Sequence, residues 1–550
     1  MLYSEHYLFD WRLTSVSEQA IIRLAQMDLL KLDLNKTTPD LPTTSELRFQ
    51  VALLAAVAAL GASFIARFVF GAPLVPELLA QFVFALAPIW AVEIAVGMLG
   101  SFAKHLAFLA CTVSYFLALI GAAIGYLRYA SDRVPTGLRS YAAISFGILV
   151  WVVTVVILIP LMGGGLLGSR LQQGPIFTSI SLLISHAVYG ATLWFGTAQY
   201  IEKPMTAEAP GKIISRRRVV RGIGYAVLAL GIFDIASSLI GSWFRSGSGR
   251  VKGRSGVFPE IDGLALEITP TDDFYVVSKN AFDPQVDSKS WRLEVAGMVD
   301  SPLLLSYDEI SALPSVEQYA TLACISNEVG GDLIGNTMWK GIRLRDILKQ
   351  AGLKPGVVDI VLRARDDYTD SIPLDRAMAD GTLLVYAMNG ELLTSEHGFP
   401  LRLLVPGIYG MKNVKWITRI EAVDFDFKGY WQRRGWDDRA EYKTQSRIDS
   451  TAQRTSETVT VAGIAFAGDR GISKVEVSTD GGRTWEQAEI KPGLSAYTWV
   501  LWHKQWTPEQ AGKHLLVVRA TDSRGIVQTS QAAPPAPSGS SGYHAVTVRT

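Results

Sequence analysis

Cysteine is scarce in this chain of 550 residues, which contains only Cys111 and Cys324. Cys111 lies inside a long apolar run and Cys324 lies in a region of mixed polarity, so a disulfide between them would join a membrane-like environment to water. The scarcity therefore excludes a disulfide framework. No C-x-x-C or H-x-x-x-H spacing accompanies Cys324, which disfavours a zinc site built from protein ligands alone.

An excess of charge of either sign is also missing, because 52 Lys and Arg face 51 Asp and Glu for a net charge of +1. A broad surface for nucleic acid needs many Lys and Arg on one face. The charge balance therefore argues against a nucleic-acid partner. Hydrophobic residues are abundant instead, at 49% of the chain, and such a fraction in a chain of this length predicts membrane spans.

Long apolar runs lie between residues 50 and 244, after a polar N-terminal tail at 1–49 that does not have the pattern of an ordinary signal peptide. Each run is near the roughly 20 residues that a helix needs to cross a bilayer. The sequence therefore predicts about six transmembrane helices, at 50–70, 75–100, 103–127, 141–162, 175–198 and 220–243.

Lys and Arg gather in the loops after the third and fifth predicted spans. Because cytoplasmic loops carry such an excess, the pattern places the soluble half outside the cytoplasmic (inner) membrane. The stretch SRRRVVRGIGYAVLALG, from Ser215, also looks like a twin-arginine export signal with Arg216 and Arg217 as its pair. Ordinary positive charge at the foot of the last span explains these arginines equally well.

Ionisable residues inside membrane spans are costly and are functional candidates for that reason. Here they are Glu93, His105, His186 and Asp234. A heme between His105 and His186 would link the bilayer to redox chemistry. The two histidines lie at different depths of their predicted spans, however, so the sequence favours a polar contact between helices.

A soluble α+β domain is predicted over 257–440, after a Gly, Ser and Arg-rich linker at 245–256. Residues 291–299 alternate as a half-buried strand. Ser306 and Glu309 have the spacing of a capping box, and Gly352 follows a second short helix.

Helix signals disappear in the last part of the chain, 441–550, which reads as short alternating strands separated by turns. Asp480-Gly481-Gly482 is a typical hairpin turn. The pattern predicts an immunoglobulin-like β-sandwich. Without a cysteine pair its core depends on packing, for which the predicted residues are Trp485, Trp499 and Trp502.

Cys324 follows the apolar run YATLA and precedes a Gly-rich loop, so the thiol is expected at the end of a strand. Most lone cysteines are inert small hydrophobic residues. A thiolate is also a soft ligand for a transition metal. A metal held here would need its remaining ligands from an organic cofactor.

Three stretches resemble the sulfite oxidase family of molybdopterin enzymes: LACISNEVGGDLIGNTMWKGIRLRDIL from Leu322, HGFPLRLLVPGIYGMKNVKWITRIEAV at 397–423, and YWQRRGW at 430–436. The segment AGIAFAGDRGISKVEVSTDGGRTW is similar to that family's C-terminal dimerisation domain. The resemblance covers roughly 260–550 and not the membrane half. It implies molybdenum bound to one molybdopterin per chain, with Cys324 as the metal ligand.

The resemblance also implies roles for other residues. His397 and Arg402 match residues that contact the cofactor, and Lys415 matches a lysine near its phosphate end, where cationic donors are needed. The remaining cofactor-binding candidates are Asp272, Tyr275, Asp366 and Asn413.

Departures from the family pattern concern the substrate pocket. Sulfite-oxidising members follow the cysteine with Ala-Gly-Asn-Arg-Arg, whereas residues 325–329 here read ISNEV, and a further arginine is missing from 275–279. Trp436 replaces a pocket tyrosine, and Arg434 beside it is a remaining pocket candidate. A small dianion needs clustered guanidinium groups, so sulfite itself is a doubtful substrate.

The sequence thus predicts a membrane-anchored molybdopterin oxidoreductase that transfers an oxygen atom to or from a small, sulfur-containing substrate, with Cys324, Arg434 and Trp436 at the reacting centre. An external one-electron carrier, a cytochrome or a quinone-linked protein, is expected, and the sandwich would allow a homodimer. Two alternatives stay open. One is a sulfoxide reductase-type activity, and the other is a non-catalytic membrane sensor or transport protein with a molybdopterin-like binding module.

Overall fold

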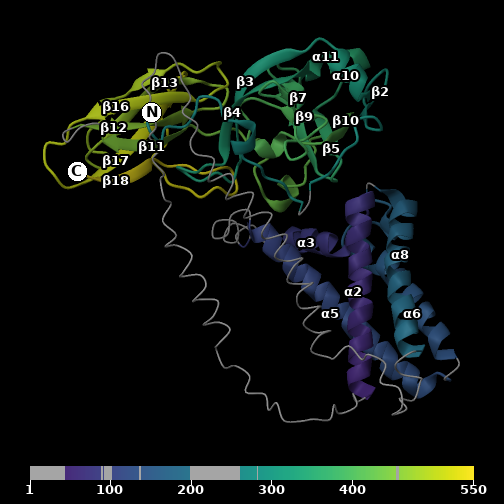
Figure 1. The fold of residues 1–550 in the computed structure, drawn as a ribbon. Coiled ribbons are helices and arrows are strands. Elements are labelled where there is room, and N and C mark those ends of the chain that lie inside the picture. Colours follow the sequence, from purple (N-terminus) through teal and green to yellow (C-terminus); the bar gives the residue numbers. More distant parts are fainter. Residues whose placement is uncertain are drawn as a thin grey trace, which may run out of the picture.

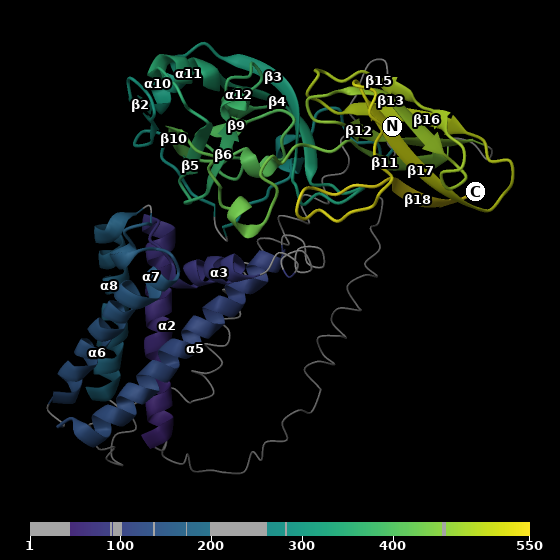
Figure 2. The same cartoon turned by 180° about the vertical axis from the view of Figure 1, so that it is seen from behind.

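The structure is a computed structural model that describes residues 44–87, 91, 102–135, 138–171, 173–198, 261–280, 283–453 and 458–550. Its elements form a group of apolar helices and two β-rich units that follow them in the chain (Figures 1 and 2). We call the β-rich units the central unit, with strands β1 to β10, and the C-terminal unit, with strands β11 to β18.

The helices pack closely against one another. A Cβ atom added at Gly147 in α6 would lie 2.9 Å from the Cα of Gly190 in α8, so these two backbones approach as closely as glycine allows. Helix α2 packs on both α5 and α8. The elements are α2 (Thr44–Phe70), α3 (Val75–Leu86), α5 (Phe102–Arg133), α6 (Arg139–Val153), η2 (Thr154–Leu158), α7 (Ile159–Leu161), η3 (Leu166–Gly168) and α8 (Gly174–Gly196).

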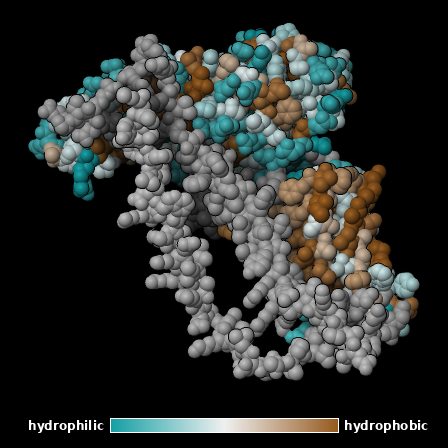
Figure 3. All heavy atoms as spheres, in the orientation of Figure 1, coloured by the Kyte–Doolittle hydropathy of each residue, from teal (hydrophilic) through white to brown (hydrophobic). Residues whose placement is uncertain are grey.

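Among the described residues, 4 helices are long and apolar enough to cross a membrane: Thr44–Phe70, His105–Ala130, Tyr141–Leu161 and Gly174–Gly196. They correspond to the spans predicted at 50–70, 103–127, 141–162 and 175–198. Their outward faces carry large apolar side chains such as Ile148, Ile176 and Ile184, and the helices look hydrophobic where Figure 3 shows them. Such a surface suits lipid and not water.

The span predicted at 75–100 differs from the structure. Helix α3 has 12 residues and ends at Leu86, and Ala87 is extended (φ −65°, ψ 130°). Pro88 comes next in the sequence, and the residue before a proline is pushed out of the helical region. Helix α3 is therefore too short to cross a bilayer alone. The span predicted at 220–243, the twin-arginine stretch, Glu93 and Asp234 lie outside the described residues.

His186 makes a polar contact between helices, as the sequence favours. Its Nδ1 lies 2.7 Å from the carbonyl oxygen of Leu182, and its Nε2 lies 3.3 Å from the hydroxyl of Thr154 and 3.5 Å from that of Tyr115. Both ring nitrogens therefore have protein partners. Within the part of the chain that the structure describes, no three His, Cys, Asp or Glu side chains gather as a metal site.

The central unit contains two sheets, with strand orders β2-β1-β10-β5-β6 and β3-β4-β7-β8, and β9 pairs with β7. The predicted capping box of Ser306 and Glu309 is confirmed, as is the left-handed Gly352 (φ 71°) after α11. The elements are η5 (Thr271–Asp273), β1 (Arg292–Gly297), β2 (Leu303–Ser306), α10 (Tyr307–Ala312), β3 (Val316–Ala323), β4 (Ile334–Arg343), α11 (Leu344–Ala351), β5 (Asp359–Ala364), β6 (Thr369–Pro373), α12 (Leu374–Ala377), β7 (Leu383–Met388), β8 (Glu391–Leu392), β9 (Arg402–Leu404), η6 (Gly410–Lys412), β10 (Ile417–Val423) and η7 (Gln432–Arg434).

The C-terminal unit consists of two antiparallel four-stranded sheets, β11-β12-β16-β15 and β14-β13-β17-β18. Trp502 is buried in the core of this unit as predicted, whereas Trp499 is buried in the core that includes residues of the central unit. The prediction for Trp485 was wrong, because its ring lies half-buried under the guanidinium of Arg519, at 4.1 Å. The immunoglobulin type of the sandwich stays a prediction. The strands are β11 (Gln445–Gln453), β12 (Val459–Phe466), β13 (Ile472–Ser478), β14 (Glu486–Gln487), β15 (Glu489–Lys491), β16 (Val500–Trp506), β17 (Lys513–Asp522) and β18 (His544–Arg549).

Candidate functional site

Cys324 stands where strand β3 ends, as the sequence predicts. Its backbone N–H donates to the carbonyl oxygen of Leu333 (2.9 Å), which closes residues 324–333 into a loop that we call the cysteine loop. The side chain is 7% exposed. Burial raises the pKa of the thiol, and hydrogen bonds from Ser326 and Ile325 oppose that rise. A bound metal cation would favour the thiolate instead.

Tyr275 lies near both Cys324 and Arg402. Burial raises the pKa of the Tyr275 hydroxyl, the nearby Cys324 raises it further, and Arg402 lowers it. Gly410 lets the chain pass close by, because a Cβ atom there would lie 2.6 Å from the Tyr275 hydroxyl and 3.2 Å from the carbonyl oxygen of Ala323. Tyr275 is therefore the point near which the end of β3, strand β9 and the loop at Gly410 come together.

Arg402 is a buried cation without a carboxylate partner among the described residues. It is 5% exposed, one Nη1–H donates to the carbonyl oxygen of His397 (3.0 Å), and its guanidinium lies 5.1 Å from the ring of Trp339. Its Nε finds no acceptor in the described part of the chain. Burial lowers the pKa of Arg402 to about 10. Since an uncompensated buried charge is costly, this side chain fits the anionic part of a ligand.

His397 and Lys415 lie beside Arg402. The Nε2–H of His397 donates to the carbonyl oxygen of Thr271 (3.1 Å). Burial, Arg402 and Lys415 lower the pKa of His397 to about 4, so the imidazole is neutral at neutral pH. Lys415 donates to the carbonyl oxygen of Glu396 (2.8 Å) and lies 4.3 Å from the ring centre of Trp416. Two cations therefore lie beside a neutral imidazole whose one N–H is already bonded to the Thr271 carbonyl.

The lowered pKa of His397 predicts a loss of stability on acidification. The ordinary histidine pKa of about 6.5 applies only to the unfolded chain. The neutral imidazole of His397 therefore contributes to the unfolding free energy above that pH, and this contribution is lost as the pH falls toward the pKa in the folded protein. In cofactor-free protein, the unfolding free energy should fall as the pH is lowered from roughly 8 to 5. In His397→Asn this fall should be smaller by about 2 kcal/mol. Denaturant titrations of both proteins at both pH values measure this difference. An equal drop in the two proteins would contradict it.

Three other predicted cofactor residues have different surroundings. Asp272 is exposed, next to the Thr271 carbonyl that His397 contacts. Asp366 accepts hydrogen bonds from the side chain of Asn280 (2.8 Å) and the backbone N–H of Tyr368 (3.2 Å). Asn413 accepts from the backbone of Val405 (2.7 Å), and its amide donates to the carbonyls of residues 408 and 409. The Asn413 side chain therefore shapes its own loop, and its role as a cofactor-binding residue stays a prediction.

Arg434 and Trp436 belong to a second cluster, on the segment that follows β10. The guanidinium of Arg434 lies 3.6 Å from the ring centre of Tyr430, and its Nε has no acceptor among the described residues. Trp436 packs edge-on to Trp431 at 6.3 Å. The ring of Tyr430 also lies 5.7 Å from that of Tyr368. The Tyr368 hydroxyl in turn lies 2.7 Å from the carbonyl oxygen of Met411, the neighbour of Gly410, so the second cluster is joined to the first through that loop.

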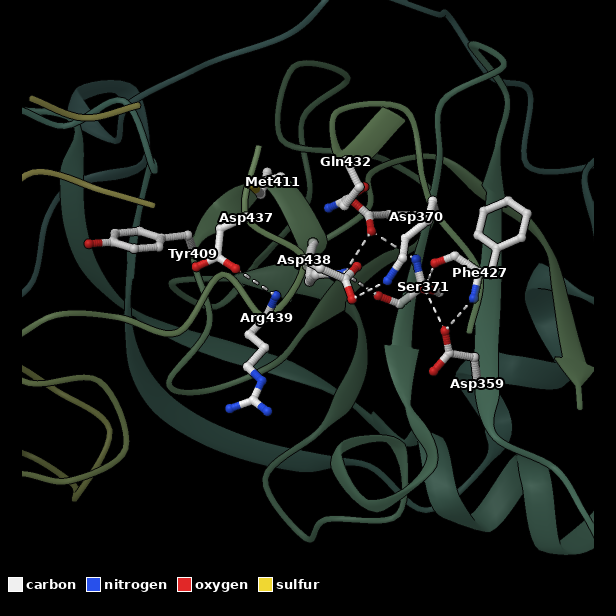
Figure 4. Close-up of polar contacts among 12 residues, drawn as sticks. Asp359, Asp370, Ser371, Tyr409, Met411, Phe427, Gln432, Asp437, Asp438 and Arg439 are labelled. Carbon is white, nitrogen blue, oxygen red and sulfur yellow. Dashed lines mark hydrogen bonds and ion pairs between the residues drawn. The ribbon is translucent and has the colours of Figure 1, made fainter. Parts of the chain in front are cut away.

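A buried ion pair that the sequence did not reveal anchors this loop. The Nζ of Lys412, 1% exposed, donates to Asp370 Oδ1 (3.0 Å) and to the carbonyl oxygen of Ser371 (2.8 Å). Gln432 and Asp438 complete the surroundings (Figure 4). Burial raises the pKa of the Asp370 carboxyl, and Lys412 opposes the rise. The pair ties the loop at Gly410 to strand β6 and to η7.

Tyr409 and Trp339 are further residues that the sequence did not single out. Burial raises the pKa of the Tyr409 hydroxyl, and so does nearby Cys324. Trp339 is fully buried under Arg402. Both residues lie inside the stretches that carry the family resemblance, so their position in the sequence was a signal. Nothing local distinguishes them from ordinary core aromatics, however.

Comparisons with known proteins agree with this arrangement. Residues 280–431 match the oxidoreductase molybdopterin binding domain, and residues 440–536 match the Mo-co oxidoreductase dimerisation domain. The uncharacterized oxidoreductase YuiH of Bacillus subtilis is 39% identical over 150 residues, which is 27% of this chain and 74% of that protein.

Sulfite oxidases are also similar to this chain. The enzyme of Gallus gallus is 31% identical over 330 residues, covering 50% of this chain and 71% of that protein. The mitochondrial enzyme of Rattus norvegicus is 32% identical over 48% of this chain, a match that spans 58% of the rat protein. Among solved structures, the sulfane dehydrogenase SoxCD of Paracoccus pantotrophus aligns with a TM-score of 0.48 and 24% identity, over 56% of this chain and 89% of that one.

The central unit is therefore matched by a molybdopterin binding domain and the C-terminal unit by a Mo-co oxidoreductase dimerisation domain, and two relatives above 30% identity are matched over more than two thirds of their length. The chain belongs to the sulfite oxidase family of molybdopterin-dependent oxidoreductases.

Proposed function

We propose that this chain is a membrane-anchored oxidoreductase that uses one molybdopterin-bound molybdenum to move an oxygen atom to or from a small, sulfur-containing substrate. The observation that carries the proposal is the buried Arg402 guanidinium, which has no carboxylate partner among the described residues and lies near Tyr275, as the Cys324 thiol does. A cation buried in this way calls for an anionic ligand group. A phosphate-bearing pterin beside a thiol ligand supplies one.

In this proposal the chain contributes binding and positioning. Cys324 would bind the metal as thiolate, while Arg402 and Lys415 would hold the anionic end of the pterin through charged donors, with His397 beside them. The metal, when bound, supplies the two-electron chemistry. The neutral His397 donates its Nε2–H to the Thr271 carbonyl, and this hydrogen bond fixes the orientation of the ring. Lys412 and Asp370 hold the loop at Gly410 against Tyr275.

The surroundings of Cys324 favour an uncharged or organic substrate over sulfite. Ile325, directly after the cysteine, is buried and apolar, and Glu328 adds a negative charge near the place where sulfite-oxidising members carry arginines. Arg434, in the second cluster, stays a candidate for binding the substrate, because its Nε has no acceptor among the described residues. Steady-state assays with artificial electron donors and acceptors, with sulfite, thiosulfate and methyl sulfoxides as substrates, decide between oxidation and sulfoxide reduction.

Membrane anchoring is supported by the 4 long apolar helices among the described residues. We place the catalytic units on the outer side of the cytoplasmic membrane, where an external one-electron carrier would exchange electrons with the site. The dimerisation domain at residues 440–536 supports a homodimer. Chain cross-linking and protease accessibility in intact cells and in spheroplasts test these two points.

Metal analysis separates an enzyme from a non-catalytic sensor. Full-length protein purified in detergent from a molybdopterin-producing host should contain about one molybdenum per chain, as one thiolate site implies. Protein that contains no molybdenum in such a host would overturn the proposed function and favour a membrane protein with a ligand-binding module.

A further inference from the structure

The cysteine loop is held from outside by the C-terminal unit. The Oγ–H of Ser540 donates to the carbonyl oxygen of Asn327 (2.7 Å), and Arg447 Nη1–H donates to the carbonyl oxygen of Gly331 (2.6 Å). A Cβ atom added at Gly330 would lie 2.4 Å from the ring of His544, so the loop backbone lies directly on that imidazole. The cysteine loop is therefore contacted by side chains from β11, from β18 and from the segment before β18.

Hydrogen bonds inside the loop connect these contacts to the residue that carries the thiol. The backbone N–H of Asn327 donates to the carbonyl oxygen of Cys324 (3.1 Å), and the N–H of Leu333 donates to the side-chain oxygen of Asn327 (2.9 Å). Cys324 itself donates to the carbonyl of Leu333. A displacement of Asn327 therefore moves the backbone of Cys324.

The side chains that contact the loop are themselves held by hydrogen bonds. The Nε–H of Arg447 pairs with Asp449, whose second carboxylate oxygen accepts from the backbone N–H of Ala265 (3.2 Å). The Nδ1 of His544 accepts from the backbone N–H of Ile448 (3.0 Å). A cavity of about 20 Å³ lies between Asn327, Gly331 and Arg447, which leaves room for about one water. The donors are thus held in place before they meet the loop, and little space allows the loop to shift.

We propose that Arg447 and Ser540 are positioning residues that set the place of the Cys324 thiol through the cysteine loop. The inference rests on the proposed function, in which Cys324 is the metal ligand. It gives the C-terminal unit a role in the active site, in addition to the dimerisation for which its domain is named. Removing either donor would leave a loop carbonyl without its partner and let the loop open more often.

Thiol reactivity in cofactor-free protein tests this role without any metal. The full chain with Cys111→Ala, produced in a host that makes no molybdopterin, has Cys324 as its single thiol. Arg447→Met and Ser540→Ala should each raise the rate of Cys324 alkylation by N-ethylmaleimide about tenfold, since each removes a buried hydrogen bond. Arg447→Lys, which keeps a donor, should restore most of the slow rate. Arg519→Met, which removes an ion pair with Glu476 in the same unit, should change it less than about twofold.

Loaded protein gives a second readout. The electron paramagnetic resonance spectrum of molybdenum should change in Arg447→Met and stay as in the wild type in Arg519→Met. Unchanged alkylation rates in Arg447→Met and Ser540→Ala would overturn the positioning role, as would equal increases in all variants including Arg519→Met. Absence of molybdenum from the protein would instead overturn the proposed function, and the alkylation rates would still decide whether the C-terminal unit holds the loop.

Discussion

Replacement of Cys324 by serine should lower turnover by more than about a thousandfold, the scale seen when an enzyme loses a central catalytic group. A serine hydroxyl has nearly the shape of the thiol, so the buried site keeps its packing, but it is a hard, protonated oxygen where the metal needs a soft thiolate. The measurement is the rate with an artificial electron acceptor or donor, expressed per molybdenum. Thermal unfolding of both proteins checks that the fold survives.

Cys111→Ser provides the matched control for this prediction. Cys111 lies in helix α5, outside both soluble units. Its replacement should leave turnover per molybdenum within about twofold of the wild type, since the substitution lies far from the site and keeps the side-chain size. Equal losses in the two variants, or full activity in Cys324→Ser, would show that the thiol is no metal ligand.

Lys412→Met should lower the free energy of unfolding by about 3–5 kcal/mol, because it leaves the buried Asp370 carboxylate without its partner. Both side chains of this pair are at most 2% exposed. Denaturant unfolding followed by tryptophan fluorescence measures the loss. Lys412→Met combined with Asp370→Asn should recover part of the stability, because the second change removes the unpaired charge.

An exposed pair near the same segment serves as the control. Lys428 binds Asp426 and Asp438 with all three side chains more than 40% exposed. Lys428→Met should therefore cost no more than about 1 kcal/mol. A loss of the same size in Lys412→Met and Lys428→Met would contradict the view that the buried pair anchors the loop at Gly410.

Local signals predicted the soluble fold well. The capping box at Ser306 and Glu309 and the Gly352 cap depend on interactions within a few residues, and the alternation over 291–299 is a local pattern; the structure contains all three. The end of Cys324's strand was also visible, because the apolar run stops at that residue. A proline was the signal overlooked in the helical N-terminal part, where α3 ends two residues before Pro88.

The candidate site was less predictable, because burial and partners come from distant segments. Lys412 and Lys415 stand three residues apart in the same motif, and the sequence alone does not show that Lys412 turns inward to Asp370. The hydrogen bonds of Asn413 to its own loop are equally invisible in the sequence. Arg447 and Ser540 reach the cysteine loop from positions 116 and 213 residues away along the chain. No local sequence pattern predicts such long-range contacts.

X-ray absorption spectroscopy at the molybdenum edge tests most directly whether Cys324 binds the metal. Wild-type protein and Cys324→Ser, both loaded with molybdenum and both folded, should differ by the loss of one sulfur neighbour from the metal in the variant. An identical sulfur shell in the two proteins would contradict the assignment of Cys324 as the ligand.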